Sequence, residues 1–199
     1  MEDFNSIISD TEIEVHPWPP FYNRDSRILI MGTFPPQPKR WSMNFYYPNP
    51  TNDFWPMMAL IFFGDRNALN VKGSKQFDLD AIKELLTTHG IAMNDTGHKI
   101  RRLKGNASDK YLEIIEPVDL EGLLNLMPDC HTIATTGEKA AGVVARLTDT
   151  EIPKMGDFVT SSTGLDIWRM PSTSRAYPLK LEKKAEYYAE MFRKAGILP

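Results

Sequence analysis

The 199-residue chain has a single cysteine, Cys130, and it lacks any long hydrophobic run. One cysteine excludes an internal disulfide and any metal site that is built on several thiolates. No apolar stretch approaches the roughly 20 residues that a membrane-spanning helix needs. The first residues, MEDFNSIISDTEIEV, are acidic, whereas a secretory signal starts with a basic region. We therefore expect a cytoplasmic protein in a reducing compartment, without contact with a membrane.

The signature motifs of several common enzyme classes are also missing. The chain has no phosphate-binding GxxxxGK[ST], no dinucleotide-binding GxGxxG, no nucleophile elbow GxSxG and no zinc-binding HExxH. The histidines are dispersed along the sequence, at His16, His89, His98 and His131. We expect no metal site and no cofactor, and structural roles for His89 and His131.

The charge balance does not by itself indicate a nucleic-acid-binding protein. Lys and Arg number 23 against 26 Asp and Glu, which gives a net charge of −3. Binding to DNA responds to the local potential rather than to the total charge, so clusters still matter. Basic residues cluster at Lys39 and Arg40 and again at Lys99, Arg101, Arg102 and Lys104. For either cluster taken alone, ordinary solvated surface charge is a sufficient interpretation.

Apolar runs and helical periodicities alternate along the chain. Short apolar or β-branched runs predict buried strands at 27–32, 91–95, 131–137 and 165–172. Apolar residues at helical spacing predict helices at 52–63, 78–89, 119–127, 138–147 and 179–196. This alternation predicts an α/β protein, a three-layer α/β/α sandwich around a central, mainly parallel four-stranded sheet. We expect residues 1–199 to form a single domain and a monomer, with an irregular lead-in at 1–26.

The unusual sequences follow the predicted strands. In parallel α/β sheets, ligands bind beyond the carboxyl ends of the strands, and the loops concerned begin after Gly32, Asp95, Gly137 and Met170. Aromatic rings stack on planar bases, while amides and carboxylates read base edges. Small hydroxyl residues and backbone amides hold phosphates. The four loops are therefore predicted to form one site with the chemistry for a nucleotide or nucleic acid.

The aromatic residues after the first strand allow two interpretations. Phe54 and Trp55 fall on the predicted helix 52–63, and we expect them to pack in the core beneath the loop. Tyr46 and Tyr47 lie within the loop itself, where a core position and a ligand-stacking position are both open.

Several short segments resemble, in their order along the chain, the motifs of a known family. They are HPWPP (16–20), GTFPP (32–36), YYPNPTNDFWPMM (46–58), GIAMND (90–95), GNASD (105–109) and MPSTS (170–174). The chain thus resembles the uracil-DNA glycosylase superfamily, and within it the branch of hypoxanthine-DNA glycosylases. The resemblance implies a metal-independent, monofunctional enzyme that flips a deaminated base, such as hypoxanthine or uracil, out of DNA and hydrolyses its N-glycosidic bond. DNA containing a damaged base is the implied partner.

The resemblance also implies roles for individual residues. Tyr47 matches the aromatic residue that stacks on the flipped base, and Phe34 and Asn94 fall at further base-binding positions. Asn52 and Asp95 are the implied catalytic residues: Asn52 orients a water or hydrogen-bonds the leaving base, and Asp95 hydrogen-bonds the base. Each also has a structural alternative, because Asn52 can cap the following helix and Asp95 can cap the turn after its strand.

The implied DNA-binding residues lie at the ends of the two later strands. They are Gly137, where a helix N-terminus can accept a phosphate, and the phosphate-binding turn of Pro171, Ser172, Thr173, Ser174 and Arg175.

The chain departs from the family pattern at Phe34, Asn49, Thr136 and Arg175. These departures leave a second function open: a catalytically weak or inactive protein of the same fold that binds lesion DNA. A hydrolase of free nucleosides or nucleotides on a similar fold is a third.

Overall fold

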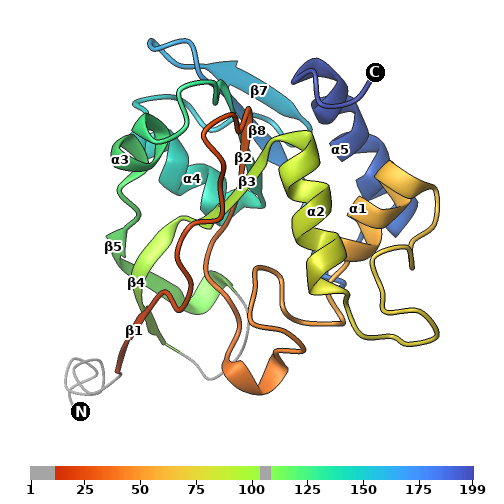
Figure 1. Cartoon of the computed structure of the whole chain (residues 1–199). Helices are drawn as coiled ribbons and strands as arrows, with labels where there is room; N and C mark the ends of the chain where they lie inside the picture. The colour runs from red at the N-terminus through yellow and green to blue at the C-terminus, as the bar shows by residue number, and fades with distance from the viewer. Residues whose placement is uncertain (1–11, 104–108) are drawn as a thin grey trace.

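A five-stranded sheet forms the centre of the computed structural model, which describes residues 12–103 and 109–199 (Figure 1). Its strand order is β3-β2-β6-β8-β7. The strands are β2 (Ile28–Gly32), β3 (Ile91–Asp95), β6 (Thr132–Thr136), β7 (Asp157–Thr160) and β8 (Asp166–Met170). The first three and β8 are parallel, as the sequence predicts, while β7 pairs antiparallel with β8 at the edge. The predicted α/β fold class is confirmed, with one strand more than expected.

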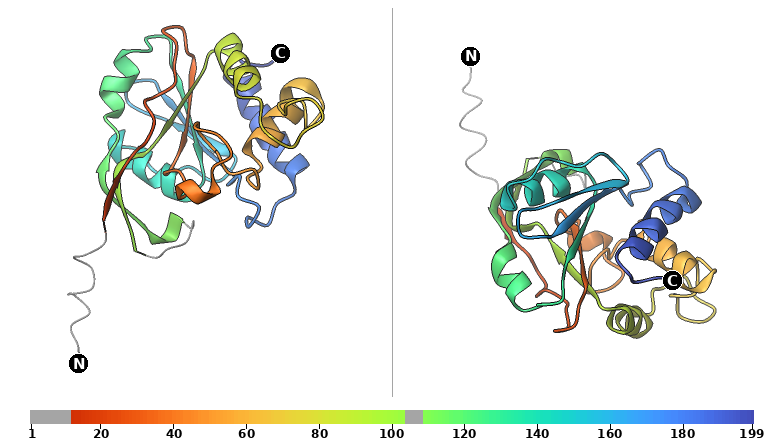
Figure 2. Two further views of the ribbon diagram at one scale, coloured as in Figure 1. Left: turned by 60° about the horizontal axis from the view of Figure 1, so that its bottom comes forward. Right: turned by 90° about the horizontal axis from the view of Figure 1, so that it is seen from above.

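Helices cover both faces of this sheet (Figure 2). The helices are α1 (Phe54–Phe63), α2 (Leu79–His89), α3 (Leu120–Asn125), α4 (Glu138–Leu147) and α5 (Leu181–Lys194). All five lie where apolar periodicity predicts them. Asp78 and Asp119 cap α2 and α3. Each accepts a hydrogen bond from the backbone N–H of the third residue of its helix.

The alternation of side chains along β2 divides the core into two layers. Ile28 and Ile30 pack with residues of α1, α2 and α5 in one cluster. Leu29 and Met31 pack with residues of α3 and α4 in the other. Successive strand residues point to opposite faces, so one short apolar run supplies both layers. The three-layer sandwich follows from this arrangement.

A second sheet lies beside the main one and was not expected from the sequence. Strands β1 (Ile13–Val15), β4 (Gly97–Arg102) and β5 (Leu112–Pro117) form it in the order β1-β4-β5, all antiparallel. The expected irregular lead-in therefore contains a strand, although residues 1–11 lie outside the described part of the chain. These strands are short and carry many charged residues, so no apolar alternation marks them.

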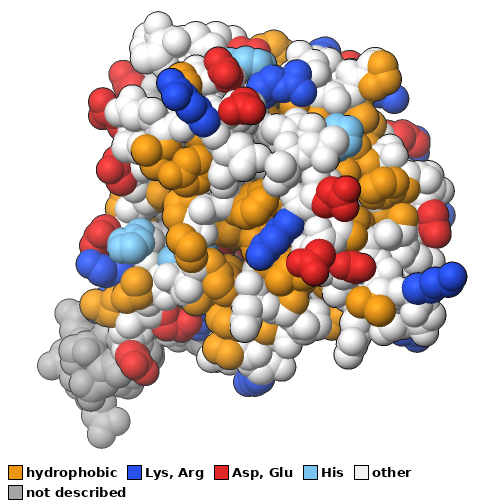
Figure 3. Space-filling view, viewed as in Figure 1, with side chains coloured by type: hydrophobic (Ala, Val, Ile, Leu, Met, Phe, Trp, Pro, Cys, Tyr) orange, Lys and Arg blue, Asp and Glu red, His pale blue; other side chains and the backbone are white. Residues whose placement is uncertain are grey.

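The second basic cluster of the sequence, at 99–104, has its described residues on or next to strand β4 of this sheet, where acidic side chains neutralise it. Lys99 bonds Glu116 at 2.6 Å and Arg101 bonds Glu113 at 3.0 Å across the β4–β5 pair. On the face shown in Figure 3, Lys and Arg side chains are scattered among acidic ones. Lys104 lies outside the described residues. The cluster thus offers little positive potential for a nucleic acid.

Within residues 12–103 and 109–199, no helix has both the length and the apolar character that a membrane crossing demands.

Candidate functional site

A cleft of about 680 Å³ opens beyond the carboxyl ends of the parallel strands. This volume falls within the roughly 300–1,000 Å³ typical of ligand pockets. The last residues of β2, β3 and β6 and the loops that follow β2 and β8 line it, together with the segment that leads into α1. The structure brings together there most of the predicted site residues: Phe34, Tyr47, Asn52, Asp95, Ser172, Thr173, Ser174 and Arg175.

Three predicted site residues do not line this cleft. Asn94 is 5% exposed, and its amide hydrogen-bonds the hydroxyl of Tyr46 at 3.1 Å. Because neighbouring strand residues face opposite sides, Asp95 reaches the cleft and Asn94 does not. The structure therefore does not place Asn94 where the predicted contact with a base would require it. Gly137 and Pro171 line an adjoining pocket of about 460 Å³, which shares Ser172 with the cleft.

Of the four aromatic residues at positions 46, 47, 54 and 55, three lie in the core and one lines the cleft. Phe54 and Trp55 are 0% and 1% exposed, which confirms their expected place in the core. Tyr46 is also core, at 1% exposure, and Trp55 Nε1 donates to its carbonyl oxygen at 3.0 Å. Tyr47 is the member of this group that lines the cleft.

Tyr47 is held in a fixed orientation. Its φ of 50° is uncommon for a residue with a side chain. Its ring stacks on Phe54 with centroids 3.9 Å apart and an interplanar angle of 12°. Its hydroxyl lies 2.6 Å from Thr136 Oγ1. Burial, and then the charge of Asp95, raise the pKa of Tyr47 well above its usual value. Tyr47 is thus a neutral phenol with one ring face covered by Phe54.

The amide oxygen of Asn52 accepts a hydrogen bond at the start of α1. The donor is the N–H of Phe54, the first residue of α1, whose nitrogen lies 2.8 Å from Asn52 Oδ1. Asn52 thus caps the start of the helix from one residue before Asp53, which occupies the N-cap position and makes no side-chain cap bond. The amide Nδ2 carries the two donors of the side chain. Since Asn52 also lines the cleft, the cap fixes the amide while leaving its donor end for a ligand.

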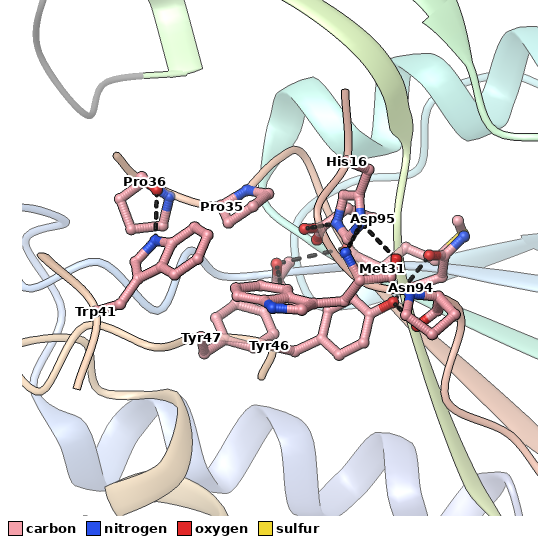
Figure 4. A network of polar contacts seen from close by, with 12 residues as sticks. His16, Met31, Pro35, Pro36, Trp41, Tyr46, Tyr47, Asn94 and Asp95 are labelled. Carbon is pink, nitrogen blue, oxygen red and sulfur yellow. Dashed lines mark hydrogen bonds and ion pairs between the residues drawn. The ribbon is translucent and has the colours of Figure 1, made fainter. Parts of the chain in front are cut away.

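Asp95 hydrogen-bonds a histidine that was not predicted from the sequence to belong to the site. Its Oδ2 lies 3.0 Å from Nε2 of His16, and both side chains are less than 10% exposed. Figure 4 shows the two side chains next to each other, close to Tyr46 and Tyr47. The alternative role of Asp95 as a turn cap is not what the structure shows, because Thr96 N donates to Gly32 O instead. His16 heads the HPWPP segment, which was the available signal.

Gly32 leaves space for these groups at the floor of the cleft. A Cβ at this position would come within 2.6 Å of Asp95 Oδ1 and 3.0 Å of the Tyr47 hydroxyl. We therefore expect Gly32→Ala to lower the free energy of unfolding by about 1–3 kcal/mol and to weaken any activity of the cleft. Urea denaturation measures the first effect. Gly142→Ala in α4 is the matched control: its Cβ would meet Ile152 at an ordinary 3.6 Å, so equal losses in both variants would contradict the expectation.

Asp109 brings a further carboxyl to the cleft. Thr33 Oγ1 donates to its Oδ2 at 2.8 Å. Neighbouring atoms crowd this carboxyl although the residue as a whole is exposed. This desolvation raises the pKa of Asp109, and the charge of Asp95 raises it further, while the hydrogen bond from Thr33 lowers it. Asp109 ends the GNASD segment, whose residues 105–108 lie outside the described part of the chain.

Side chains hold the proline-rich loop that carries Phe34. Arg102 Nη2 donates to Pro35 O at 2.6 Å, and its guanidinium lies 5.6 Å from the centre of the Phe34 ring. Trp41 Nε1 donates to Pro36 O at 2.6 Å, as the dashed line in Figure 4 marks. Proline has no backbone N–H, so it cannot support itself through its own donors. The buried Arg102 therefore fixes the Phe34 wall of the cleft.

A buried ion pair joins the two sides of the cleft. Asp53 Oδ2 accepts from Lys184 Nζ at 2.9 Å, and Asp53 Oδ1 accepts from Arg175 Nε at 3.0 Å. Lys184 is 0% exposed and also donates to Ser174 O at 2.8 Å. The N–H of Asp53 donates to Thr173 O. These bonds attach the turn after β8 to the start of α1.

Neither member of this pair was predicted from the sequence to belong to the site. Lys184 lies three residues after Leu181 and four before Tyr188, both buried. A lysine in the middle of the apolar stripe of a predicted helix was the signal, because a buried lysine needs an acidic partner.

Within the described part of the chain, no three His, Cys, Asp or Glu side chains are grouped as a metal site would require.

Solved structures share this architecture, among them the solution NMR structure of a "putative Uracil DNA glycosylase" from Methanosarcina acetivorans, with a TM-score of 0.65. The two chains are 20% identical, and the match covers 93% of this chain and 99% of that chain. They share one fold. No family model and no curated protein matches the chain.

Proposed function

We propose that the protein is a DNA glycosylase that accepts a deaminated base in the cleft and hydrolyses its N-glycosidic bond. One observation carries the proposal: an aromatic ring and an amide donor from one loop and a carboxyl from a distant strand line a single cleft. These are Tyr47, Asn52 and Asp95. The shared fold with the Methanosarcina acetivorans protein supports it.

Each of these side chains suits one demand of the reaction. Tyr47 is braced from behind by Phe54, and stacking on such a ring is worth about 1–3 kcal/mol per base. The Asn52 amide donates a hydrogen bond to the departing base, on which negative charge develops as the bond breaks. Asp95 bonds the edge of the base and thereby holds it in the cleft.

The loops beyond β6 and β8 suit the DNA backbone. Gly137 begins α4, and a helix N-terminus favours a phosphate. Ser172 lines both the cleft and the adjoining pocket, and the turn that follows it, residues 173–175, lines the cleft. In this proposal the turn positions the strand on either side of the extruded nucleotide, while the ion pair of Asp53 and Lys184 holds the turn in place.

We further propose that the enzyme is monofunctional and that water, rather than a protein amine, attacks the sugar. Among the described residues, none of those that line the cleft is a lysine. Lys184 lies close by, but it is buried and bonded to Asp53 and Ser174. Hypoxanthine is the base that we expect to be preferred, with uracil and xanthine as related substrates.

A base-release assay tests the proposed function. Oligonucleotides that contain uracil, hypoxanthine or xanthine, in single and double strands, are incubated with the protein in EDTA. We expect free base and an alkali-labile abasic site, without strand cleavage before alkali. Absence of base release from every oligonucleotide would contradict the proposal. Binding of lesion DNA without release would favour the lesion-binding alternative, and turnover of free nucleosides alone would favour the nucleoside hydrolase.

A further inference from the structure

His16 determines which oxygen of Asp95 can meet a ligand. Its Nδ1 lies 2.8 Å from the carbonyl oxygen of Trp18 and 3.3 Å from the backbone nitrogen of the same residue. A carbonyl oxygen only accepts hydrogen bonds, so the shorter contact places a hydrogen on Nδ1; with the Trp18 N–H as donor to Nδ1 instead, the ring hydrogen is on Nε2. Its Nε2 lies 3.0 Å from Asp95 Oδ2. The hydrogen between these atoms belongs either to the ring or to the carboxyl, and in both arrangements it lies on the line from Nε2 to Oδ2.

The other oxygen, Oδ1, then has lone pairs and no hydrogen. Among residues 12–103 and 109–199, His16 is the only hydrogen-bond partner of the Asp95 carboxyl. Oδ1 packs against Gly32, where a Cβ would come within 2.6 Å of it. Gly32 and Asp95 both line the cleft. The cleft therefore presents a fixed hydrogen-bond acceptor, whichever member of the pair holds the proton.

A fixed acceptor distinguishes hypoxanthine and uracil from their parent bases, adenine and cytosine. Hypoxanthine carries a ring N–H at N1, and uracil carries one at N3. Adenine and cytosine have a lone pair at the corresponding ring nitrogen. An acceptor bonds the first group and repels the second, because two lone pairs face each other there. Xanthine also carries N1–H, but so does its parent guanine, and the acceptor does not separate these two.

We propose that His16 is a positioning residue that fixes Asp95 as an acceptor for the ring N–H of a lactam base. This inference rests on the proposed function and names its substrate class. Without His16, no hydrogen bond holds Oδ2, so the carboxyl can rotate and can present either oxygen to the cleft. A protonated oxygen can then face the base and donate to its lone pair, so the rates for the two groups of bases differ less.

The fold holds the His16 ring firmly enough for this role. The N–H of His16 donates to His98 O at 2.8 Å, which extends the pairing of β1 with β4 by one residue. The ring stacks on Tyr46 with centroids 5.7 Å apart. Phe34 and Trp18 meet it edge-on at 5.4 Å and 5.8 Å. The second sheet, which was not predicted from the sequence, thus has a structural role in the site: it positions His16 next to Asp95.

Two substitutions separate the hydrogen bond of His16 from its packing. His16→Phe keeps a ring against Tyr46 but has no donor for Asp95. His16→Gln keeps a donor, the side-chain amide, and so tests rescue. Thermal unfolding shows whether both variants fold. The substrates are duplexes that carry hypoxanthine, 1-methylhypoxanthine or adenine at one position, and single-turnover rates of base release are compared.

The wild-type protein should release hypoxanthine at least about 100-fold faster than 1-methylhypoxanthine or adenine, because the last two lack the N–H. In His16→Phe the rate of hypoxanthine release should fall about 10- to 100-fold. The ratio of the rate for hypoxanthine to the rate for adenine should fall as well. His16→Gln should recover most of the rate and the ratio.

The failures of the inference and of the proposed function are distinguishable. Equal release of hypoxanthine and 1-methylhypoxanthine by the wild-type protein would overturn the inference alone. A parallel fall for all bases in His16→Phe, with an unchanged ratio, would also overturn it, because a merely structural role predicts that result. Absence of release from all three duplexes by the wild-type protein would instead contradict the proposed function.

Discussion

Asn52→Asp is expected to lower the rate of base release about 100- to 1,000-fold while the stability of the protein stays nearly unchanged. The carboxylate keeps an oxygen to accept the N–H of Phe54, as Asn52 Oδ1 does at 2.8 Å. A negative charge near the first turn of a helix is also favourable. The substitution replaces the amide donor with an oxygen, and loss of one donor to a developing anion costs about this factor in rate. The added negative charge repels the departing base and acts in the same direction. Single-turnover assays on hypoxanthine duplexes measure it.

Asn52→Ala is the matched control for this result. It removes the donor and the cap together, so we expect a similar loss of rate and, in addition, about 1 kcal/mol of lost stability. If Asn52→Asp keeps full activity while Asn52→Ala loses it, Asn52 acts as a cap and not on the base. That outcome would contradict the assignment of Asn52 to catalysis.

Lys184→Met is expected to cost about 3–5 kcal/mol of unfolding free energy, the largest effect on stability that we foresee. Lys184 is 0% exposed and bonds Asp53 at 2.9 Å. Its removal leaves a buried carboxylate that is paired only with Arg175, whose side chain is 50% exposed. Breaking one half of a buried ion pair is costly because the other charge remains without compensation. Urea denaturation of the purified variant gives the value.

The double variant Asp53→Asn/Lys184→Met tests whether the pair is the cause. It removes both charges, so it should be more stable than the sum of the two single losses predicts, by at least about 1 kcal/mol. Additive losses would show that the two residues stabilise the fold independently. We also expect Lys184→Met to raise KM for DNA, because the turn at Ser174 loses its attachment to α1.

The parts of the fold that have a periodic apolar pattern could be predicted from the sequence. The run 27–32 and the helix 138–147 are examples, since burial alone imposes their composition. β1 and β7 could not be predicted in this way. Each has at most four residues, lies at the edge of its sheet and is partly exposed. Such strands form because a neighbouring strand offers hydrogen bonds, and a single sequence carries no trace of that neighbour.

The candidate site, too, could be predicted from the sequence only in part. The loops that follow parallel strands could be located, because the topology places their ends at one edge of the sheet. Its hydrogen-bonded side-chain pairs could not be found from their spacing: 79 residues separate His16 from Asp95, and 131 separate Asp53 from Lys184. The face on which Asn94 lies was also hidden, because every residue of β3 is buried and no polar alternation indicates its direction.

A crystal structure of the Asn52→Asp variant bound to a duplex that contains hypoxanthine tests the central claim most directly. We expect the hypoxanthine to be extruded into the cleft of about 680 Å³, stacked on the open face of Tyr47 with its N1–H directed at Asp95 Oδ1. The turn at 171–175 should contact the flanking phosphates. A base that remains stacked in the duplex, or a duplex bound to another face of the protein, would contradict the account.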